Sequence, residues 1–167
     1  MRVLIVGSGI AGLSAAIALR KVGCEVAVYE RAPELREVGA GISLWANALR
    51  ALDYIGAGAA VRAVALPMAR SEMRTKNGLR VLATFPAAAF EKTFGIAPFV
   101  AMTHRADLVG ALAAQLPAGV ARYGVECVGV EQDDRGATVR FKNGHADTAA
   151  LVVGADGLNS AVRAALF

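Results

Sequence analysis

The first 30 residues carry three glycines directly after an apolar run and end on an acid, MRVLIVGSGIAGLSAAIALRKVGCEVAVYE. Val3–Val6 is continuously apolar, as in a strand that is buried on both faces of a parallel sheet. Apolar residues then recur at helical spacing from Ile10 to Val22, and Val26–Tyr29 forms the next predicted strand. A strand, a helix and a second strand within about 30 residues make a βαβ unit. The opening therefore predicts an α/β fold with a parallel sheet.

The glycine loop GSGIAG suits the binding of a dinucleotide pyrophosphate. Gly7 permits the tight turn after the strand, Gly9 lets a phosphate approach the backbone, and Gly12 lets the helix pack closely on the strand. The helix begins at Ile10 and Ala11, so its free N–H groups and positive dipole end face the phosphates. We predict that these five residues contact the cofactor.

Glu30 ends the second predicted strand, at the position from which a carboxylate accepts hydrogen bonds from both ribose hydroxyls of an adenosine. By this criterion the ligand is either FAD or NAD, because the first βαβ unit of a chain can bind the adenosine part of either dinucleotide. Arg31 has two interpretations of equal weight: it contacts the adenosine, or it is a solvated surface arginine. A glycine-rich turn without a ligand is the disfavoured alternative, since the loop lies between a strand and a helix.

Composition excludes several classes of protein. Of the 167 residues, 56% are hydrophobic and 19% are charged, and the net charge of +4 comes without a block of lysine or arginine. This favours a folded domain over disorder and gives no nucleic-acid signature. The two cysteines and two histidines show no metal-binding spacing, so we predict no metal site. The apolar first 20 residues are broken by turn glycines and are closed by Arg20 and Lys21, which argues against a signal peptide or membrane span. We therefore expect a cytoplasmic protein that binds neither nucleic acid nor a membrane.

The rest of the sequence predicts further helices and strands of an α/β fold, with one antiparallel segment inserted among them. Between about Val64 and Val100, prolines and short β runs indicate an antiparallel excursion, with a hairpin turn at Asn77-Gly78. Around it we expect these elements: a glycine turn at 39–41 that leads into a helix through Asn47, Leu49 and Leu52; a helix over 108–116; three strands over 125–131, 137–142 and 147–153; and a last helix beginning near Asn159 or Ser160.

Four stretches give the chain a family resemblance: GSGIAGLSAAIALRKVGCEVAVYER, EVGAGISLWANALRAL, THRADL and LVVGADGLNSAVR. In order and spacing they resemble the N-terminal part of the single-component FAD-dependent aromatic hydroxylases, the para-hydroxybenzoate and salicylate hydroxylase-like flavoprotein monooxygenases. Ala46 departs from the proline that many members have before the asparagine. The resemblance covers the whole chain. It implies an FAD/NAD(P)-binding Rossmann-like domain over 1–167, whose excursion at about 64–100 extends toward a substrate domain.

The resemblance also implies positions for the flavin. Gly41 and Ile42, with Gly39 and Ser43 beside them, belong to a backbone segment that passes close to the flavin ring. Arg105 stands at the start of a predicted helix, where a cation is poorly placed for the helix dipole. The family supplies a reason for it, since this arginine holds the phosphate or ribityl part of FAD.

Two further residues follow from the resemblance. Asp156 lies at the carboxyl end of the predicted strand Leu151–Val153, where open α/β sheets bind their ligands. It either positions the dinucleotides or serves only as a turn and capping residue, and Arg163 stabilises the same corner. Cys127 stands where the family lays its backbone against the adenine, so we expect a backbone contact and no reactive thiol.

The family's reaction is an NAD(P)H-dependent hydroxylation of a small aromatic substrate on FAD. No side chain here has the partners of a general base or nucleophile, so we assign no catalytic residue to this chain. Family members are more than twice as long, which implies a truncated chain whose partner is either its own C-terminal portion or a second copy. The alternatives are a non-catalytic dinucleotide-binding fragment or pseudoenzyme, and another FAD-dependent oxidoreductase of the same fold. The apolar stretch Phe85–Phe94 is expected to face a missing layer.

Overall fold

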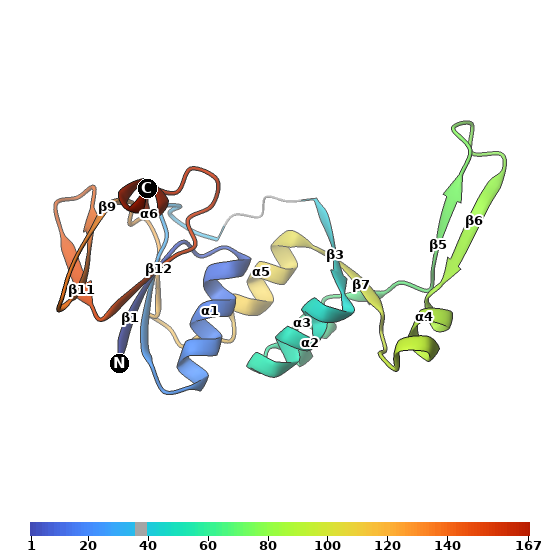
Figure 1. The fold of residues 1–167 in the computed structure, drawn as a ribbon, viewed down its shortest axis with the longest axis horizontal. Coiled ribbons are helices and arrows are strands. Elements are labelled where there is room, and N and C mark those ends of the chain that lie inside the picture. The colour runs from blue at the N-terminus through green and yellow to red at the C-terminus, as the bar shows by residue number, and fades with distance from the viewer. Residues whose placement is uncertain (36–39) are drawn as a thin grey trace.

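A computed structural model describes residues 1–35 and 40–167, and its parallel sheet lies toward the end of the molecule that holds both termini (Figure 1). The sheet has the order β12-β1-β2-β8, with β1 at Arg2–Val6, β2 at Glu25–Tyr29, β8 at Ala121–Arg122 and β12 at Leu151–Gly154. β1 and β2 are parallel neighbours, with Val3 opposite Val26 and Val6 opposite Tyr29. The predicted βαβ opening is therefore confirmed.

One face of this sheet is covered by helices. α1 (Ile10–Lys21) packs its buried Ala16 against Val3 and Ile5, two side chains that point to the same face of β1. α5 (Arg105–Ala113) lies beside α1, and its buried Leu108 and Leu112 belong to the core cluster that contains Leu13 of α1. Side chains alternate along β1, so every second residue of this strand faces the helices.

The other face is covered by an antiparallel meander of β9 (Cys127–Asp133), β10 (Gly136–Phe141) and β11 (Ala146–Ala149). Leu4 and Val6 of β1 meet the buried Val139 and Phe141 of β10. The expectation of one strand over 147–153 was wrong, because this stretch contains β11 and β12, which belong to different sheets. Residues 149–153 are continuously apolar and span the end of β11 and most of β12, so no turn residue marks the point where the chain changes sheet.

A second antiparallel sheet has the order β3-β7-β4, with β3 at Gly41–Trp45, β4 at Leu66–Pro67 and β7 at Val100–His104. The glycine turn expected before the next helix is wrong at Gly41, which begins β3 and pairs with His104. That pairing joins residues far apart in sequence, so no local pattern records it. Gly39 lies outside the described residues. The expected helix follows as α2 (Ala46–Ile55), and α3 (Gly58–Ala63) comes after it.

The excursion forms the end of the molecule farthest from the meander (Figure 1). β5 (Arg70–Arg74) and β6 (Val81–Pro86) pair as an antiparallel hairpin around Asn77-Gly78, which confirms the predicted turn. A helix that we did not predict follows, α4 (Ala87–Phe94). Phe90 and Phe94 stack on Phe99 with ring centroids 5.0 and 5.8 Å apart, and Trp45 meets Phe99 edge-on at 5.7 Å.

The chain ends in a short helix, α6 (Ala161–Leu166), which begins after Ser160 as expected. α6 packs on β9 and lies close to the carboxyl end of β12. Of the helices that the structure describes, none has both the length and the apolar character that a membrane span requires.

Candidate dinucleotide site

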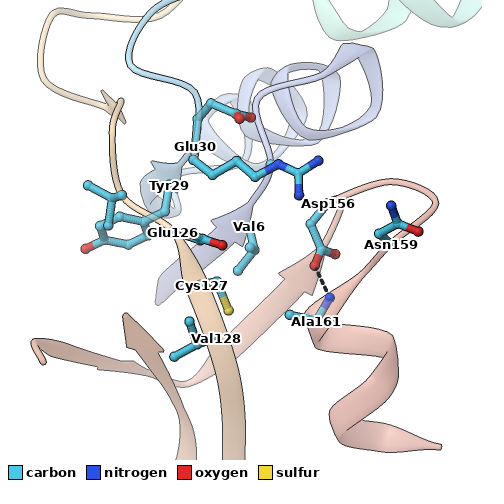
Figure 2. A pocket seen from close by; sticks show the side chains of 12 residues that line it. Val6, Tyr29, Glu30, Glu126, Cys127, Val128, Asp156, Asn159 and Ala161 are labelled. Atoms are coloured by element: carbon cyan, nitrogen blue, oxygen red, sulfur yellow. Dashed lines mark hydrogen bonds between the residues drawn. The ribbon is translucent and has the colours of Figure 1, made fainter. Parts of the chain in front are cut away.

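Two adjoining cavities open at the carboxyl ends of β1, β2 and β12, where open α/β sheets bind ligands. The first has a volume of about 270 Å³ and the second about 210 Å³, and both are lined by Glu30 and Arg31. In Figure 2, Asp156 and Asn159 lie across the first cavity from Tyr29 and Glu126. A ligand that occupies both cavities must therefore pass Glu30 and Arg31.

The structure gives a different account of why glycine stands at each of the three positions in the loop. Gly7 has a positive φ of +103°, and a Cβ there would overlap the Ala155 carbonyl. A Cβ on Gly12 would overlap the Gly7 carbonyl, because α1 packs directly on the loop. A Cβ on Gly9 would meet nothing within 4 Å. The fold requires glycine at 7 and 12, whereas at Gly9 it leaves open space beside the second cavity.

The N-terminus of α1 borders the second cavity through Gly9. Within the described residues, no side chain caps this helix end, and its first turn holds no acid. The first intrahelical bond runs from the Leu13 N–H to the Gly9 carbonyl at 3.0 Å, so the N–H groups of Ile10 and Ala11 precede the helical ladder. Arg105 lines the same cavity. Glu30, Arg31 and Glu34 line this cavity too, so the two arginines balance the two carboxylates and the helix N-terminus favours an anion there.

Glu30 is held by donors on both of its oxygens. Oε2 accepts from the Ser8 N–H at 2.9 Å and from the Ser8 hydroxyl at 3.2 Å, and Oε1 accepts from the Ala32 N–H at 2.9 Å. Burial raises the pKa of Glu30, but these hydrogen bonds and the nearby Arg31 outweigh it and hold the pKa below its ordinary value. Glu30 is therefore an ionised acceptor at neutral pH. Each oxygen has more than one lone-pair direction, so Oε1 has capacity for a further hydroxyl donor.

Cys127 lines the first cavity, and its thiol lies 3.6 Å from the Gly129 carbonyl. Burial raises the pKa of this thiol, which keeps it protonated and unreactive near neutral pH.

Asp156 lines the first cavity and also caps α6. Its Oδ1 accepts from the Ser160 hydroxyl at 2.6 Å, and its Oδ2 accepts from the Ala161 N–H at 2.7 Å (Figure 2). The capping role, one of the two interpretations of this residue, is thus present in the structure. Arg163 donates to the Leu158 carbonyl at 2.6 Å, which supports its predicted role in holding this corner.

The structure brings most of the predicted residues together, but not all of them. Gly7, Cys127 and Asp156 line the first cavity, and Gly9 and Arg105 line the second. Ala11 is exposed in the first turn of α1, Ile10 borders an apolar groove between α1 and α2, and Gly12 is buried in packing. Gly41 and Ile42 line neither cavity. They lie on β3, where the Arg105 N–H donates to the Ala40 carbonyl at 3.2 Å and so brings the start of the strand close to the second cavity.

Sequence reasoning missed one wall of the site. Val125 and Glu126 line the first cavity because the segment after β8 runs beside the chain that follows β2. The Glu30 N–H donates to the Arg122 carbonyl at 2.9 Å, and the Val125 N–H donates to the Glu30 carbonyl at 2.8 Å. These are backbone hydrogen bonds between segments far apart in the sequence, so no residue type in either segment predicts them. Ser8, Glu34, Leu35, Val109, Val128 and Asn159 are further lining residues that we did not predict.

A parallel sheet, a glycine loop before an uncapped helix and an acid at the end of β2 define a dinucleotide-binding domain. Comparison with known families makes this specific: the profile of the FAD binding domain matches residues 1–166. The chain belongs to this family.

Relatives of known activity are flavin monooxygenases. The chain is 39% identical over 163 residues to a 3-amino-4-hydroxybenzoate 2-monooxygenase of Streptomyces platensis, covering 97% of this chain and 41% of that protein. It is 36% identical to the 3-hydroxybenzoate 6-hydroxylase of Polaromonas naphthalenivorans, covering 96% of this chain and 41% of that protein. The structure of Klebsiella pneumoniae HpxO complexed with FAD and uric acid superposes with a TM-score of 0.89 at 29% identity, covering 98% of this chain and 41% of HpxO. The chain thus spans about two-fifths of the length of the relatives that it matches.

Proposed function

We propose that this chain is the FAD-binding portion of an NAD(P)H-dependent flavin monooxygenase that hydroxylates an aromatic or similar small substrate. The observation that carries the proposal is the open space at Gly9. The fold itself explains Gly7 and Gly12, whereas at position 9, beside the second cavity, no protein contact requires glycine and the approach of a phosphate would. The proposed substrate class rests on the aromatic compounds named for the relatives.

The charges of the two cavities suggest how FAD lies. The second cavity has Arg31, Arg105 and the N-terminus of α1 beside Glu30 and Glu34, so it is the more positive of the two and suits the diphosphate. The first cavity holds Glu30, Glu126 and Asp156 with a single arginine, which disfavours phosphate and suits the hydroxyl and amino groups of an adenosine. In this arrangement Glu30 receives the ribose, and the Cys127 backbone borders the adenine.

Beyond the diphosphate, the second cavity leads past Arg105 toward β3. We propose that Gly41 and Ile42 lie along the flavin end, with Arg105 holding the ribityl or phosphate part. When bound, FAD supplies the redox chemistry, accepting a hydride from NAD(P)H and reacting with oxygen. This chain's residues bind and orient the cofactor. None of the described side chains is assigned an acid–base or nucleophilic role.

The test compares two alanine substitutions of glycines that both have free space. Gly9→Ala is expected to weaken FAD and ADP binding at least tenfold, because the new methyl group occupies the place of the phosphate. Its own cost to folding is limited to weaker helix capping, up to about 1 kcal/mol. Fluorescence titration with FAD and calorimetry with ADP measure the affinities.

Gly110→Ala is the matched control, since a Cβ there also meets nothing within 4 Å and the residue lies in α5 outside both cavities. It should leave both affinities unchanged. If Gly9→Ala binds FAD and ADP as tightly as the unsubstituted chain, the proposed placement of the diphosphate is wrong.

Turnover is a separate question, because the chain spans about two-fifths of its relatives. With FAD, NADH or NADPH and a panel of phenols and benzoates, we expect the 167 residues to form hydrogen peroxide and no hydroxylated product. The reason is that hydroxylation requires water to be excluded from the flavin, and among the described residues we place only those of β3 and its neighbours at the flavin end. Coupled product formation would show instead that the chain is a complete enzyme, which chromatography of product and a peroxide assay distinguish.

A further inference from the structure

Glu126 lines the first cavity, and the proposed function gives it no particular role. It stands in the segment between β8 and β9, where hydrogen bonds fix the backbone on both sides. The Val125 N–H donates to the Glu30 carbonyl at 2.8 Å, and the Lys142 N–H donates to the Glu126 carbonyl at 2.9 Å. Glu126 is therefore held in place between the end of β2 and the meander.

The carboxylate of Glu126 has one engaged oxygen and one open oxygen. Oε2 accepts from the Lys142 ammonium at 2.8 Å, whereas no residue within 1–35 and 40–167 donates to Oε1. The hydrogen bond from Lys142 and the charge of the nearby Arg31 hold the pKa of Glu126 below its ordinary value. Glu126 is therefore ionised at neutral pH and can only accept. Its side chain is 43% exposed, so a ligand in the cavity can reach it.

The other two carboxylates that line the first cavity already have donors on both oxygens. Glu30 accepts from the backbone at Oε1 and at Oε2. Asp156 accepts from the Ser160 hydroxyl at Oδ1 and from the backbone of α6 at Oδ2. Among the described residues that line this cavity, Glu126 is thus the carboxylate with an oxygen that no donor occupies.

The position of Glu126 along the two cavities relates it to the base of the nucleotide. Glu30 lines both cavities, whereas Glu126 and Cys127 line the first alone (Figure 2). With the diphosphate in the second cavity and the ribose at Glu30, the part of the ligand that extends farther into the first cavity is the adenine. The edge of adenine carries an amino group, which is a hydrogen-bond donor.

We propose that Glu126 is a specificity-determining residue of the adenosine site, whose open oxygen accepts a hydrogen bond from the exocyclic amino group of the adenine. The assignment rests on the proposed function, because it names the group that the first cavity recognises. An ionised carboxylate has no hydrogen to donate, so it favours a base edge with a donor and disfavours one without. Glu126 therefore selects adenine through a contact that a base without the amino group cannot make.

The test combines Glu126→Ala with a ligand that lacks the partner group, purine riboside diphosphate, in which a hydrogen atom replaces the amino group of ADP. The unsubstituted chain should bind ADP about tenfold more tightly than this analogue, because the analogue loses a hydrogen bond to a charged group. In Glu126→Ala the ratio of the two affinities should fall to about one, whatever the lost charge does to both. Calorimetry measures all four affinities.

Glu131→Ala is the matched control for the loss of charge. Glu131 is an exposed carboxylate that pairs with Arg140 at 2.7 Å, as Glu126 pairs with Lys142, and it lines neither cavity. Its removal changes the net charge by the same amount, so the tenfold preference for ADP should remain. A preference that disappears in both variants would be an effect of charge and would overturn the proposal.

The comparison of the two ligands in the unsubstituted chain does not depend on the folding of a variant, and it separates two failures. Equal affinities for ADP and the analogue would overturn the role of Glu126 and leave the adenosine site in place. A preference for ADP that survives in Glu126→Ala would do the same, because another acceptor would then contact the amino group. If the unsubstituted chain binds neither nucleotide and no FAD, the proposed function fails, and the role of Glu126 fails with it.

Discussion

The two ends of the molecule differ in how their apolar residues are covered. Around the parallel sheet, Leu4, Ile5 and Leu13 have no exposed surface, because α1 covers one face and β10 the other. In the hairpin of β5 and β6, Leu79 is 86% exposed and Leu82 is 55% exposed. The sheet region is thus a closed core, whereas the hairpin presents apolar side chains that no described residue buries.

The difference bears on function as well as on stability. Both cavities and every predicted adenosine and phosphate contact belong to the closed region. A two-stranded hairpin is at best marginally stable alone and gains stability from a further layer. We propose that this layer is supplied by the remainder of a longer chain or by a second copy. The closed region should therefore bind adenosine phosphates by itself, and the hairpin region should depend on what covers it.

The largest expected effect is that of Gly12→Ala in the closed region. The added Cβ would overlap the carbonyl of Gly7, a backbone atom that cannot rotate away. We expect α1 to be forced off the loop, with a loss of about 3–5 kcal/mol in the free energy of unfolding. Urea unfolding followed by circular dichroism measures it. A loss below about 1 kcal/mol would show that the loop and α1 are less tightly packed than the structure has them.

The next effect is on binding, from Glu30→Ala. Removing an ionised hydrogen-bond acceptor costs about 1.5–3 kcal/mol, or roughly tenfold to a hundredfold in FAD affinity. Flavin fluorescence titration is the measurement. Glu131→Ala provides a control, because this exposed carboxylate pairs with Arg140 in the meander at 2.7 Å and lines neither cavity. Equal affinities for the Glu30 and Glu131 variants would contradict the ribose assignment.

The features of the fold and the site that the sequence could predict are those set by nearby residues, and the features it could not predict depend on contacts between distant segments. Ile10 to Lys21 and the strands on either side follow from local periodicity, since the loop, the helix and Glu30 lie within one unit of the chain. β3 was missed because it exists only through pairing with β7, about 60 residues away. β11 and β12 were merged because both are short, and Ala150 between them has no turn character. The wall at Val125 and Glu126 depends on backbone bonds to Glu30, which no side chain reveals.

A smaller effect concerns the ion pair that joins the meander to the parallel sheet. Arg2 donates to both oxygens of Asp147 at 2.6 and 2.7 Å, and the Tyr29 hydroxyl also donates to Asp147. The Arg2 hydrogen bonds hold the pKa of Asp147 below its ordinary value, although partial burial opposes them. Burial and the bond to Asp147 raise the pKa of Tyr29 to about 12, so its hydroxyl stays a donor at neutral pH.

The sign of the pH effect follows from the lowered pKa of Asp147. Its contribution to stability is present above its unfolded-state pKa of about 4 and is lost as the pH falls through the folded-state value. Asp147→Asn should lower the free energy of unfolding by about 1–2 kcal/mol at pH 7. It should also reduce the further loss between about pH 5 and pH 3. Urea unfolding at several pH values tests this, and an unchanged acid limb in the variant would exclude Asp147 as its source.

The smallest effect should come from Gly78→Ala at the tip of the hairpin. Gly78 has a φ of +71°, which an alanine adopts at a cost of about 1 kcal/mol, although a Cβ there meets nothing within 4 Å. Because the hairpin lies away from both cavities, hydrogen exchange should increase in β5 and β6 while FAD affinity stays the same. Amide exchange measured by mass spectrometry resolves the two regions. Faster exchange in β1 or α1 of this variant would show that the hairpin and the closed core unfold together, and the two ends of the molecule would then be one cooperative unit.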